Sequence, residues 1–176
     1  MQLLLHTCCA PCSLKCIQSL QEEGIEPTLF WFNPNIQPYT EFKMRKNTLV
    51  QFAKDANLQL VIDKSYDVKA FVDAVYKDFA NRCRYCYQMR MEAVAKYAVQ
   101  NGYQSFSSTL FISPYQNHEL MRAEAQAAAE KHGSAFLYRD FRPLFREGQA
   151  AARESGLYMQ KYCGCIFSEQ ERYLKS

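Results

Sequence analysis

Five short apolar segments alternate with longer segments of helical periodicity along this chain. The apolar segments, which we expect to be strands, cover residues 3–5, 27–32, 58–62, 105–112 and 135–138. The helical segments cover residues 12–23, 39–57, 68–79, 85–100, 120–131 and 144–154, and a last helix is expected after Cys165. Strands that are separated by helices form βαβ units with parallel pairing. The order therefore predicts an α/β fold with a mostly parallel five-stranded sheet and helices on both faces.

The length of 176 residues, with 48% hydrophobic residues, suits a single domain, 1–176, with a real core. In open parallel sheets, ligands bind beyond the carboxyl ends of the strands. The loop after the first expected strand carries Cys8, Cys9 and Cys12. The functional site is therefore expected at this edge of the sheet.

Charge and hydropathy point to a cytoplasmic protein with no membrane partner. No apolar run approaches the roughly 20 residues of a membrane-spanning helix. Residues 1–6 lack the basic start and the longer apolar run of a signal peptide. The net charge of +3 permits a polyanionic partner without demanding one.

Eight cysteines are the strongest chemical signal in the sequence. Structural disulfides are rare in a reducing cytosol, so this number points to metal or redox chemistry. Cys8, Cys9 and Cys12 form one group, Cys83-x-x-Cys86 a second and Cys163-x-Cys165 a third, with Cys16 apart. We expect Cys16 to be a buried thiol of the core.

Three chemistries remain open on cysteine spacing alone. A structural zinc ion takes four ligands, which leaves three of the seven grouped thiols unexplained. Cys9-Ala-Pro-Cys12 at the start of a helix is typical of a dithiol redox pair, but that interpretation leaves the other cysteines without a role. An iron–sulfur cluster with a second metal ion uses all seven and is favoured. A zinc-stabilised RNA-binding module and a cytosolic dithiol oxidoreductase are the alternatives.

Several blocks of the sequence are similar to one known family. They are LLHTCCAPC at 4–12, FNPNIQPY at 32–39, RCRYCYQMR at 82–90, SSTL at 107–110, SPYQ at 113–116, RDFRP at 139–143 and GLYMQKYCGC at 156–165. In these blocks the chain resembles the epoxyqueuosine reductases of the QueH type. The resemblance implies reduction of the epoxide of epoxyqueuosine at the wobble position of tRNA, which leaves the cyclopentene of queuosine.

The resemblance also implies a 4Fe–4S cluster and an adjacent mononuclear iron, on a fold like those of nucleotide-binding and tRNA-thiolating (HUP-like) enzymes. The cluster ligands expected from it are Cys9, Cys83, Cys86 and Cys163. Cys8, Cys12 and Cys165 are expected to face the second metal. Some relatives carry Asp where this chain has Cys12, and a thiolate there makes the second site softer, so zinc is an alternative ion.

The expected partners are a tRNA that carries epoxyqueuosine in its anticodon loop and an external one-electron donor. Among the protonatable groups near the expected edge, Asp140 and Tyr162 are the predicted catalytic residues. Aromatic rings commonly hold unstacked bases of RNA, and amide groups hydrogen-bond them. The predicted substrate-binding residues are Asn33, Asn35, Tyr39, Tyr115 and Arg142.

Overall fold

In the computed structural model, which describes residues 2–174, five strands and seven helices alternate as the sequence predicts. The strands are β1 (Leu3–His6), β2 (Pro27–Trp31), β3 (Leu60–Ile62), β4 (Ser105–Ser108) and β5 (Ala135–Phe136). The helices are α1 (Ala10–Glu22), α2 (Tyr39–Asp55), α3 (Val68–Tyr76), α4 (Arg82–Gln100), α5 (His118–His132), α6 (Phe145–Glu154) and α7 (Ile166–Tyr173). The α/β fold class is confirmed.

All five strands are parallel, in the order β3-β2-β1-β4-β5. β1 lies at the centre, where Leu5 pairs in register with Leu29 of β2 and with Ser107 of β4. The chain order reverses between β1 and β4. Loops diverge at such a switch point and leave a crevice beyond the carboxyl ends of the strands.

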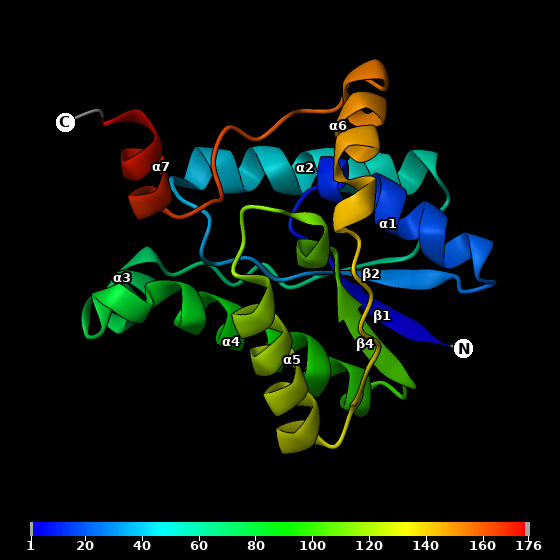
Figure 1. The fold of residues 1–176 in the computed structure, drawn as a ribbon, viewed down its shortest axis with the longest axis horizontal. Coiled ribbons are helices and arrows are strands. Elements are labelled where there is room, and N and C mark those ends of the chain that lie inside the picture. Colours follow the sequence, from blue (N-terminus) through cyan, green and yellow to red (C-terminus); the bar gives the residue numbers. More distant parts are fainter. Residues whose placement is uncertain (1, 175–176) are drawn as a thin grey trace.

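Helices cover both faces of the sheet (Figure 1). In that view α1, α2 and α6 lie above the sheet, while α4 and α5 lie below it. Leu3, Leu4 and Leu5 are consequently all buried, since their side chains meet a helical layer on either face. In α5, the small residues Ala125 and Ala129 are buried and allow close packing against α4.

Four of the five strands are shorter than predicted; β2 ends at Trp31 rather than at residue 32, and β3 begins at Leu60 rather than at residue 58. β4 ends at Ser108, and residues Thr109–Ile112 form a short 3-10 helix instead of continuing the strand. The hydroxyl of Ser108 accepts a hydrogen bond from the amide of Leu110 and so caps this turn. β5 ends at Phe136 rather than at residue 138. The shorter β4 turns Thr109 toward the crevice at the switch point.

Candidate functional site

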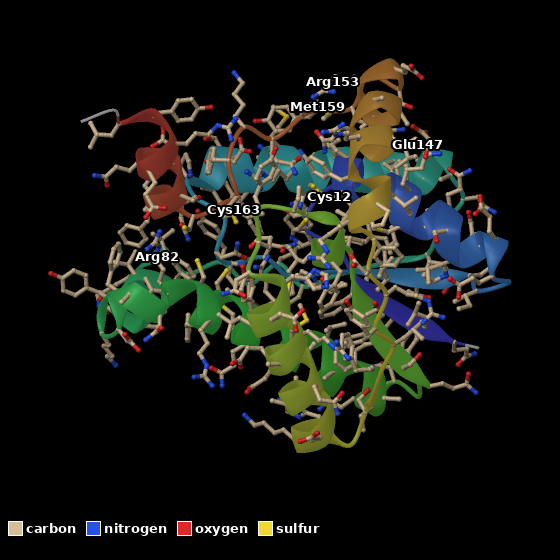
Figure 2. The ribbon with its side chains drawn as sticks, in the orientation of Figure 1. Cys12, Arg82, Glu147, Arg153, Met159 and Cys163 are labelled. Carbon is tan, nitrogen blue, oxygen red and sulfur yellow. The ribbon has the colours of Figure 1, made fainter. Side chains whose placement is uncertain are left out.

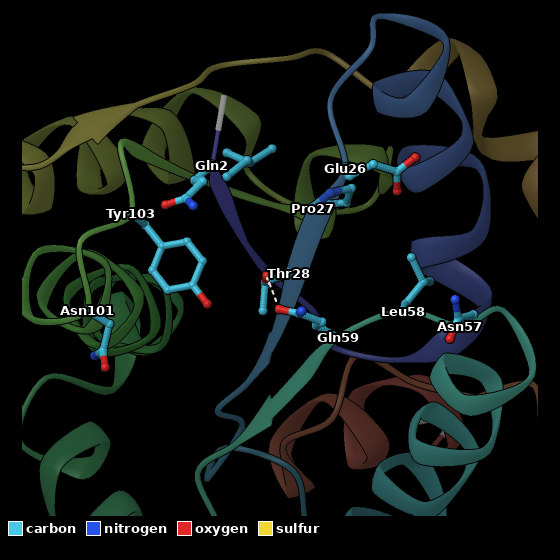
Figure 3. A pocket seen from close by; sticks show the side chains of 10 residues that line it. Gln2, Glu26, Pro27, Thr28, Asn57, Leu58, Gln59, Asn101 and Tyr103 are labelled. Atoms are coloured by element: carbon cyan, nitrogen blue, oxygen red, sulfur yellow. Dashed lines mark hydrogen bonds between the residues drawn. The ribbon is translucent and has the colours of Figure 1, made fainter.

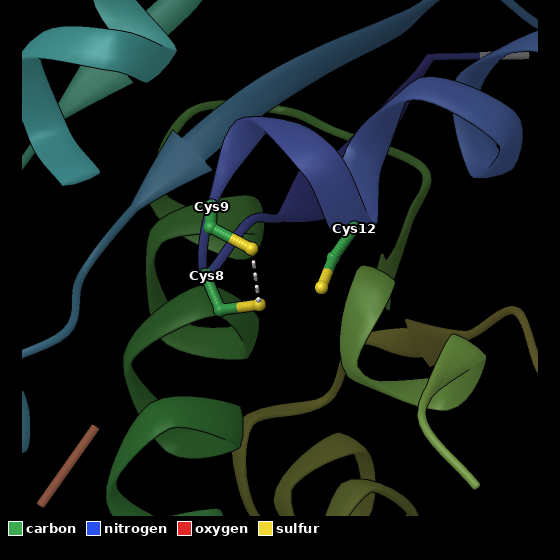
Figure 4. Close-up of side chains that lie close together, drawn as sticks. All are labelled: Cys8, Cys9 and Cys12. Carbon is green, nitrogen blue, oxygen red and sulfur yellow. Dashed lines mark hydrogen bonds between the residues drawn. The ribbon is translucent and has the colours of Figure 1, made fainter. Parts of the chain in front are cut away.

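Three cysteine side chains converge where β1 ends and α1 begins (Figure 4). The sulfur atoms of Cys8, Cys9 and Cys12 all lie within 4.8 Å of one another, and Cys8 Sγ is 3.7 Å from Cys9 Sγ. Cys9 is the residue that precedes α1, and Cys12 follows it by one helical turn. The C-C-x-x-C spacing thus produces a preformed set of three buried sulfur ligands.

The three thiols share their protons unequally. Hydrogen bonds from Cys12 and Cys9 hold the pKa of Cys8 well below its usual range. The hydrogen bond between Cys12 and Cys8 raises the pKa of Cys12, and burial raises the pKa of Cys9. Of the three thiols, the thiolate form is therefore most favoured at Cys8. A full set of thiolate ligands requires a cation, whose binding would release the remaining protons.

Four further cysteines form a second group between α4 and the segment before α7. Burial raises the pKa of Cys86 to about 12, and the thiolates of Cys163, Cys165 and Cys83 raise it further. Burial likewise raises the pKa of Cys83, with contributions from Cys163 and Cys165. These four thiols are near enough to act on one another electrostatically.

The expected division of the seven cysteines between a cluster and a second metal stays a prediction, beside which the structure shows which thiols lie together. Sequence similarity led us to place Cys9 with Cys83, Cys86 and Cys163, and Cys165 with Cys8 and Cys12. In the structure, Cys9 lies with Cys8 and Cys12, while Cys165 acts on Cys83 and Cys86.

A buried arginine holds the C-terminal strap, residues 157–165, against α2. Arg45 is 1% exposed and donates from Nη1 to the carbonyl oxygen of Cys163 (3.0 Å) and from Nη2 to that of Tyr162 (2.9 Å). Its Nε donates to Glu41 Oε1 at 2.7 Å, which neutralises the buried charge. This arginine therefore positions the backbone that carries Cys163.

The strap makes its sharpest approach to the β2–α2 loop at Gly164. This residue has φ +149°, and an added Cβ would lie 3.1 Å from Ile36 Cγ1 and 3.3 Å from Asn35 Nδ2. The amide of Gln37 donates to the carbonyl oxygen of Gly164 at 2.8 Å. Glycine between the two cysteines is thus required by the close approach and by the backbone conformation.

A second buried arginine faces the four-cysteine group. Arg90 is 1% exposed and donates from Nε to the carbonyl oxygen of Cys86 (3.0 Å) and from Nη2 to Cys86 Sγ (3.2 Å). Within residues 2–174 it forms no ion pair with a carboxylate. A buried cation is costly unless an anion accompanies it, and its nearest side-chain acceptor, Cys86 Sγ, becomes an anion when a bound metal displaces the thiol proton. The surroundings of Arg90 therefore fit an anionic, thiolate-bound cofactor.

Residues of both cysteine groups border one cavity of about 760 Å³. Cys8, Cys12 and Cys163 line it, together with residues from α6, the strap and α7. Figure 2 shows Cys12 and Cys163 in the region between α6 and α7, with Arg153 and Met159 above them in that view. A ligand in this cavity can reach both groups of thiols.

Two glutamines contact the sulfur atoms at the cavity wall, and sequence reasoning had assigned them no role. Gln160 Nε2 donates to Cys12 Sγ (3.2 Å), and Gln116 Nε2 donates to Cys163 Sγ (3.1 Å). The Oε1 atom of Gln160 is buried and has no hydrogen-bond partner. It offers an unused acceptor next to Cys12. Both residues lie in blocks shared with the related family, which was the only signal for them.

A second cavity, of about 620 Å³, lies at the opposite edge of the sheet (Figure 3). It is lined by residues at the amino ends of the strands, among them Gln2, Thr28, Gln59 and Tyr103. Thr28 Oγ1 donates to Gln59 Oε1 at 3.4 Å across its wall. Its lining contains no cysteine or histidine, whereas three cysteines line the cavity at the carboxyl edge.

Comparison with known proteins identifies the family that the cysteine-containing blocks of the sequence indicate. The family model of epoxyqueuosine reductase QueH matches residues 3–171. The chain belongs to this family. It is 37% identical over 174 residues to the epoxyqueuosine reductase QueH of Dehalococcoides mccartyi, covering 99% of this chain and 96% of that protein. It is 33% identical to the QueH of Thermotoga maritima, covering 96% of this chain and 91% of that protein.

A solved structure shares the fold at low sequence identity. It is described as a predicted subunit of a tRNA methyltransferase from Methanocaldococcus jannaschii. The two chains superpose with a TM-score of 0.56 at 13% identity, over 93% of this chain and 94% of the other. This similarity supports the α/β architecture of this QueH family member.

Besides the cysteines, two residues predicted to act in catalysis or substrate binding line the cavity. Tyr115 is 84% exposed, and its ring meets Phe145 edge-on with 5.6 Å between the centroids. Tyr162 lines the cavity with its ring, while its hydroxyl donates to the carbonyl oxygen of Gln37. Burial raises the pKa of Tyr162 to about 12, so its phenol keeps its proton at neutral pH.

Three predicted substrate-binding residues lie outside the cavity lining. Asn33 is buried and donates from Nδ2 to the carbonyl oxygen of Thr7 at 2.8 Å, which holds the loop after β1. Asn35 is buried beside Gly164. Tyr39 packs its ring on Phe42 at the surface. In this structure these residues shape the loops around the cysteines.

Asp140 and Arg142 pair with each other instead of facing the cavity. Arg142 Nη2 lies 2.6 Å from Asp140 Oδ2, and neither residue lines the cavity. Hydrogen bonding from Arg142 lowers the pKa of Asp140 to about 2. The carboxyl is therefore ionised at neutral pH and holds no proton to donate, so the geometry gives no support to the predicted catalytic role.

Within residues 2–174, no helix is both long and apolar enough to cross a membrane.

Proposed function

We propose that this protein reduces epoxyqueuosine to queuosine in tRNA. The chain belongs to the epoxyqueuosine reductase QueH family, and it matches relatives of that name along almost its whole length. The observation that carries the proposal is the meeting of Cys8, Cys12 and Cys163, from two cysteine groups, at one cavity. A cavity of about 760 Å³ is of the size that accommodates a nucleoside.

The two cysteine groups suit two different metal centres. Cys83, Cys86, Cys163 and Cys165 supply the four thiolates that a 4Fe–4S cluster requires. Cys8, Cys9 and Cys12 supply three ligands for a mononuclear ion, iron or zinc, and leave a coordination position open. Together the bound groups would supply electrons and a Lewis acid for the epoxide oxygen. This division is the alternative that we propose to the one expected from sequence similarity.

The reaction sets requirements that the chain's own residues can meet. Removing the epoxide oxygen breaks two C–O bonds, forms the C=C bond, consumes two electrons and two protons, and releases water. An external one-electron donor must supply the electrons in two steps. Tyr162, whose phenol stays protonated beside the cavity, is the candidate proton donor. Gln160 Oε1 is free to accept a hydrogen bond from the substrate next to Cys12.

The test measures iron, acid-labile sulfide and zinc in protein purified without oxygen, followed by reduction of epoxyqueuosine-containing tRNA with a chemical reductant. We expect about five irons to four sulfides if both centres hold iron, and about four to four plus one zinc if the second ion is zinc. Zinc without sulfide, and no reduction, would favour the zinc-stabilised RNA-binding alternative. Absence of metal with activity dependent only on Cys9 and Cys12 would favour the dithiol alternative.

Single cysteine variants test the division between the centres. Cys83→Ala should lose acid-labile sulfide, whereas Cys12→Ala should retain four irons and four sulfides and lose the second metal. Cys16→Ala is the matched control, because Cys16 is buried and its Sγ only donates to the carbonyl oxygen of Cys12. Loss of sulfide in Cys12→Ala, or a full cluster in Cys83→Ala, contradicts the proposed division.

A further inference from the structure

Four positively charged side chains line the cavity without ion-pair partners. They are Arg146 and Arg153 from α6, Lys161 from the strap and Arg172 from α7. All four are exposed, and none forms an ion pair within the described part of the chain. Among the residues that line the cavity there is no Asp or Glu. The cavity therefore presents uncompensated positive charge.

Four other arginines are already paired with carboxylates. Arg82 contacts Glu171, Arg84 contacts Glu124, and Arg139 contacts Glu23, in addition to the Arg142–Asp140 pair. The partners of these residues neutralise them. The four cations at the cysteine-lined cavity are not neutralised in this way.

Helix α6 separates its charges by face. Phe145, Arg146, Gln149 and Arg153 line the cavity at helical spacing. Glu147 turns the other way, where it pairs with Lys15 of α1, and Figure 2 shows Glu147 and Arg153 on opposite sides of α6. On the opposite wall, Ser168 and Arg172 lie one turn apart in α7 and both face the cavity.

The geometry points to a binding site for the phosphates that flank the substrate nucleotide, with Arg146 and Arg153 on one wall and Lys161 and Arg172 on the other. The inference rests on the proposed function, because it takes an RNA anticodon loop as the ligand. Phosphate contacts supply most of the affinity for nucleic acid and fix its register. The base would enter between the walls toward Cys8 and Cys12.

The shape of the site favours RNA over an acidic protein. The cations surround a hollow that contains reactive thiols, and a single-stranded loop can place one unstacked nucleotide in such a hollow. Tyr115, 84% exposed at the cavity beside Phe145, offers a ring on which a neighbouring base can stack. A folded acidic protein would meet only the rim of the cavity.

The experiment measures binding of a short RNA hairpin with an anticodon-type loop as a function of salt concentration. The double variant Arg146→Gln/Arg153→Gln is compared with Lys54→Gln/Lys96→Gln, which removes the same charge from exposed positions outside the cavity. We expect the cavity variant to bind about tenfold more weakly at low salt, with a salt slope smaller by about 0.7 for each lost contact. The control should bind like the wild type, and Arg146→Lys/Arg153→Lys should restore the slope.

Equal slopes for the wild type and the cavity variant would overturn the inference, as would an equal loss in the control. A second result would also overturn the inference: the variant binds RNA with an unchanged salt slope but is reduced more slowly by an acidic protein donor. The cations would then serve the electron donor. Failure of the proposed function would look different from failure of this inference. The cavity variant would still bind RNA more weakly than the wild type, but the wild type would reduce no epoxyqueuosine.

Discussion

The Nη2 atom of Arg90 lies 3.2 Å from Cys86 Sγ, with the guanidinium group buried and unpaired by any carboxylate of residues 2–174. Burial by itself would lower the pKa of Arg90, but the thiolates of Cys86, Cys163 and Cys8 raise it, so the charge is retained. Cys86 and Cys163 belong to one cysteine group and Cys8 to the other. A single buried cation thus acts on both groups.

We predict that Arg90→Met lowers the reduction potential of a cluster held by the four-cysteine group. Removing a nearby positive charge makes the addition of an electron less favourable. A charged hydrogen bond worth about 1.5 kcal/mol corresponds to about 60 mV for one electron. A redox titration followed by absorbance measures the shift. Arg84→Met on the same helix is the control, since Arg84 is exposed and pairs with Glu124; equal shifts in both variants would contradict the prediction.

We predict that Arg45→Met destabilises the protein by about 3 kcal/mol, because the variant leaves the half-buried Glu41 carboxylate without its partner. Urea unfolding measures this loss. The variant should also retain less sulfide, since Arg45 holds the backbone at Cys163. Glu41→Gln keeps a hydrogen-bonding group and should cost less. A destabilised variant with full sulfide content would show that Arg45 does not position Cys163.

We predict that Gly164→Ala displaces the strap and lowers metal retention. The added methyl group would contact Ile36 at 3.1 Å, in a backbone conformation that disfavours side chains. The cost is on the order of 1–3 kcal/mol. Gly102→Ala is the control, because Gly102 has φ +74° but open space around it. Metal analysis should find a loss only in the Gly164 variant; retention of both metals there would show that the strap tolerates the change.

We predict that Asp140 contributes to stability and not to turnover. Because folding lowers the pKa of Asp140 from about 3.9 in an unfolded chain to about 2, its stabilisation is complete above about pH 4 and is lost as pH falls through 2. The pair is partly exposed, so Asp140→Asn should cost less than about 1 kcal/mol at pH 7. Unfolding curves of the two proteins should converge near pH 2. A large fall in kcat for this variant would restore the catalytic role.

We predict that Tyr162→Phe lowers kcat by on the order of 100-fold if the phenol supplies the proton, with metal and sulfide content unchanged. The same variant loses the hydrogen bond to Gln37, which could displace the strap and Cys163. Unchanged metal and sulfide content would show that Cys163 is still in place. Unchanged kcat would remove Tyr162 as the proton donor.

The sequence alone determined the architecture and the chemical elements of the site. The alternation of apolar and helical segments predicted the five-stranded α/β fold, since those periodicities are local properties of the chain. The number of cysteines and their spacing predicted a metal site, and the position of Cys8, Cys9 and Cys12 after the first strand predicted its edge of the sheet. The blocks around these residues pointed to the family.

Only the tertiary structure decided how those elements combine. The place of Cys163 and Cys165 depends on where the strap lies, and Arg45 and Gly164 fix that through contacts distant in sequence. Which arginines stay unpaired depends likewise on whether a carboxylate from another element is within reach: Arg142 meets Asp140, while Arg146 and Arg153 meet none. Charge pairing and ligand grouping are properties of distances between elements, and a linear sequence does not specify those distances.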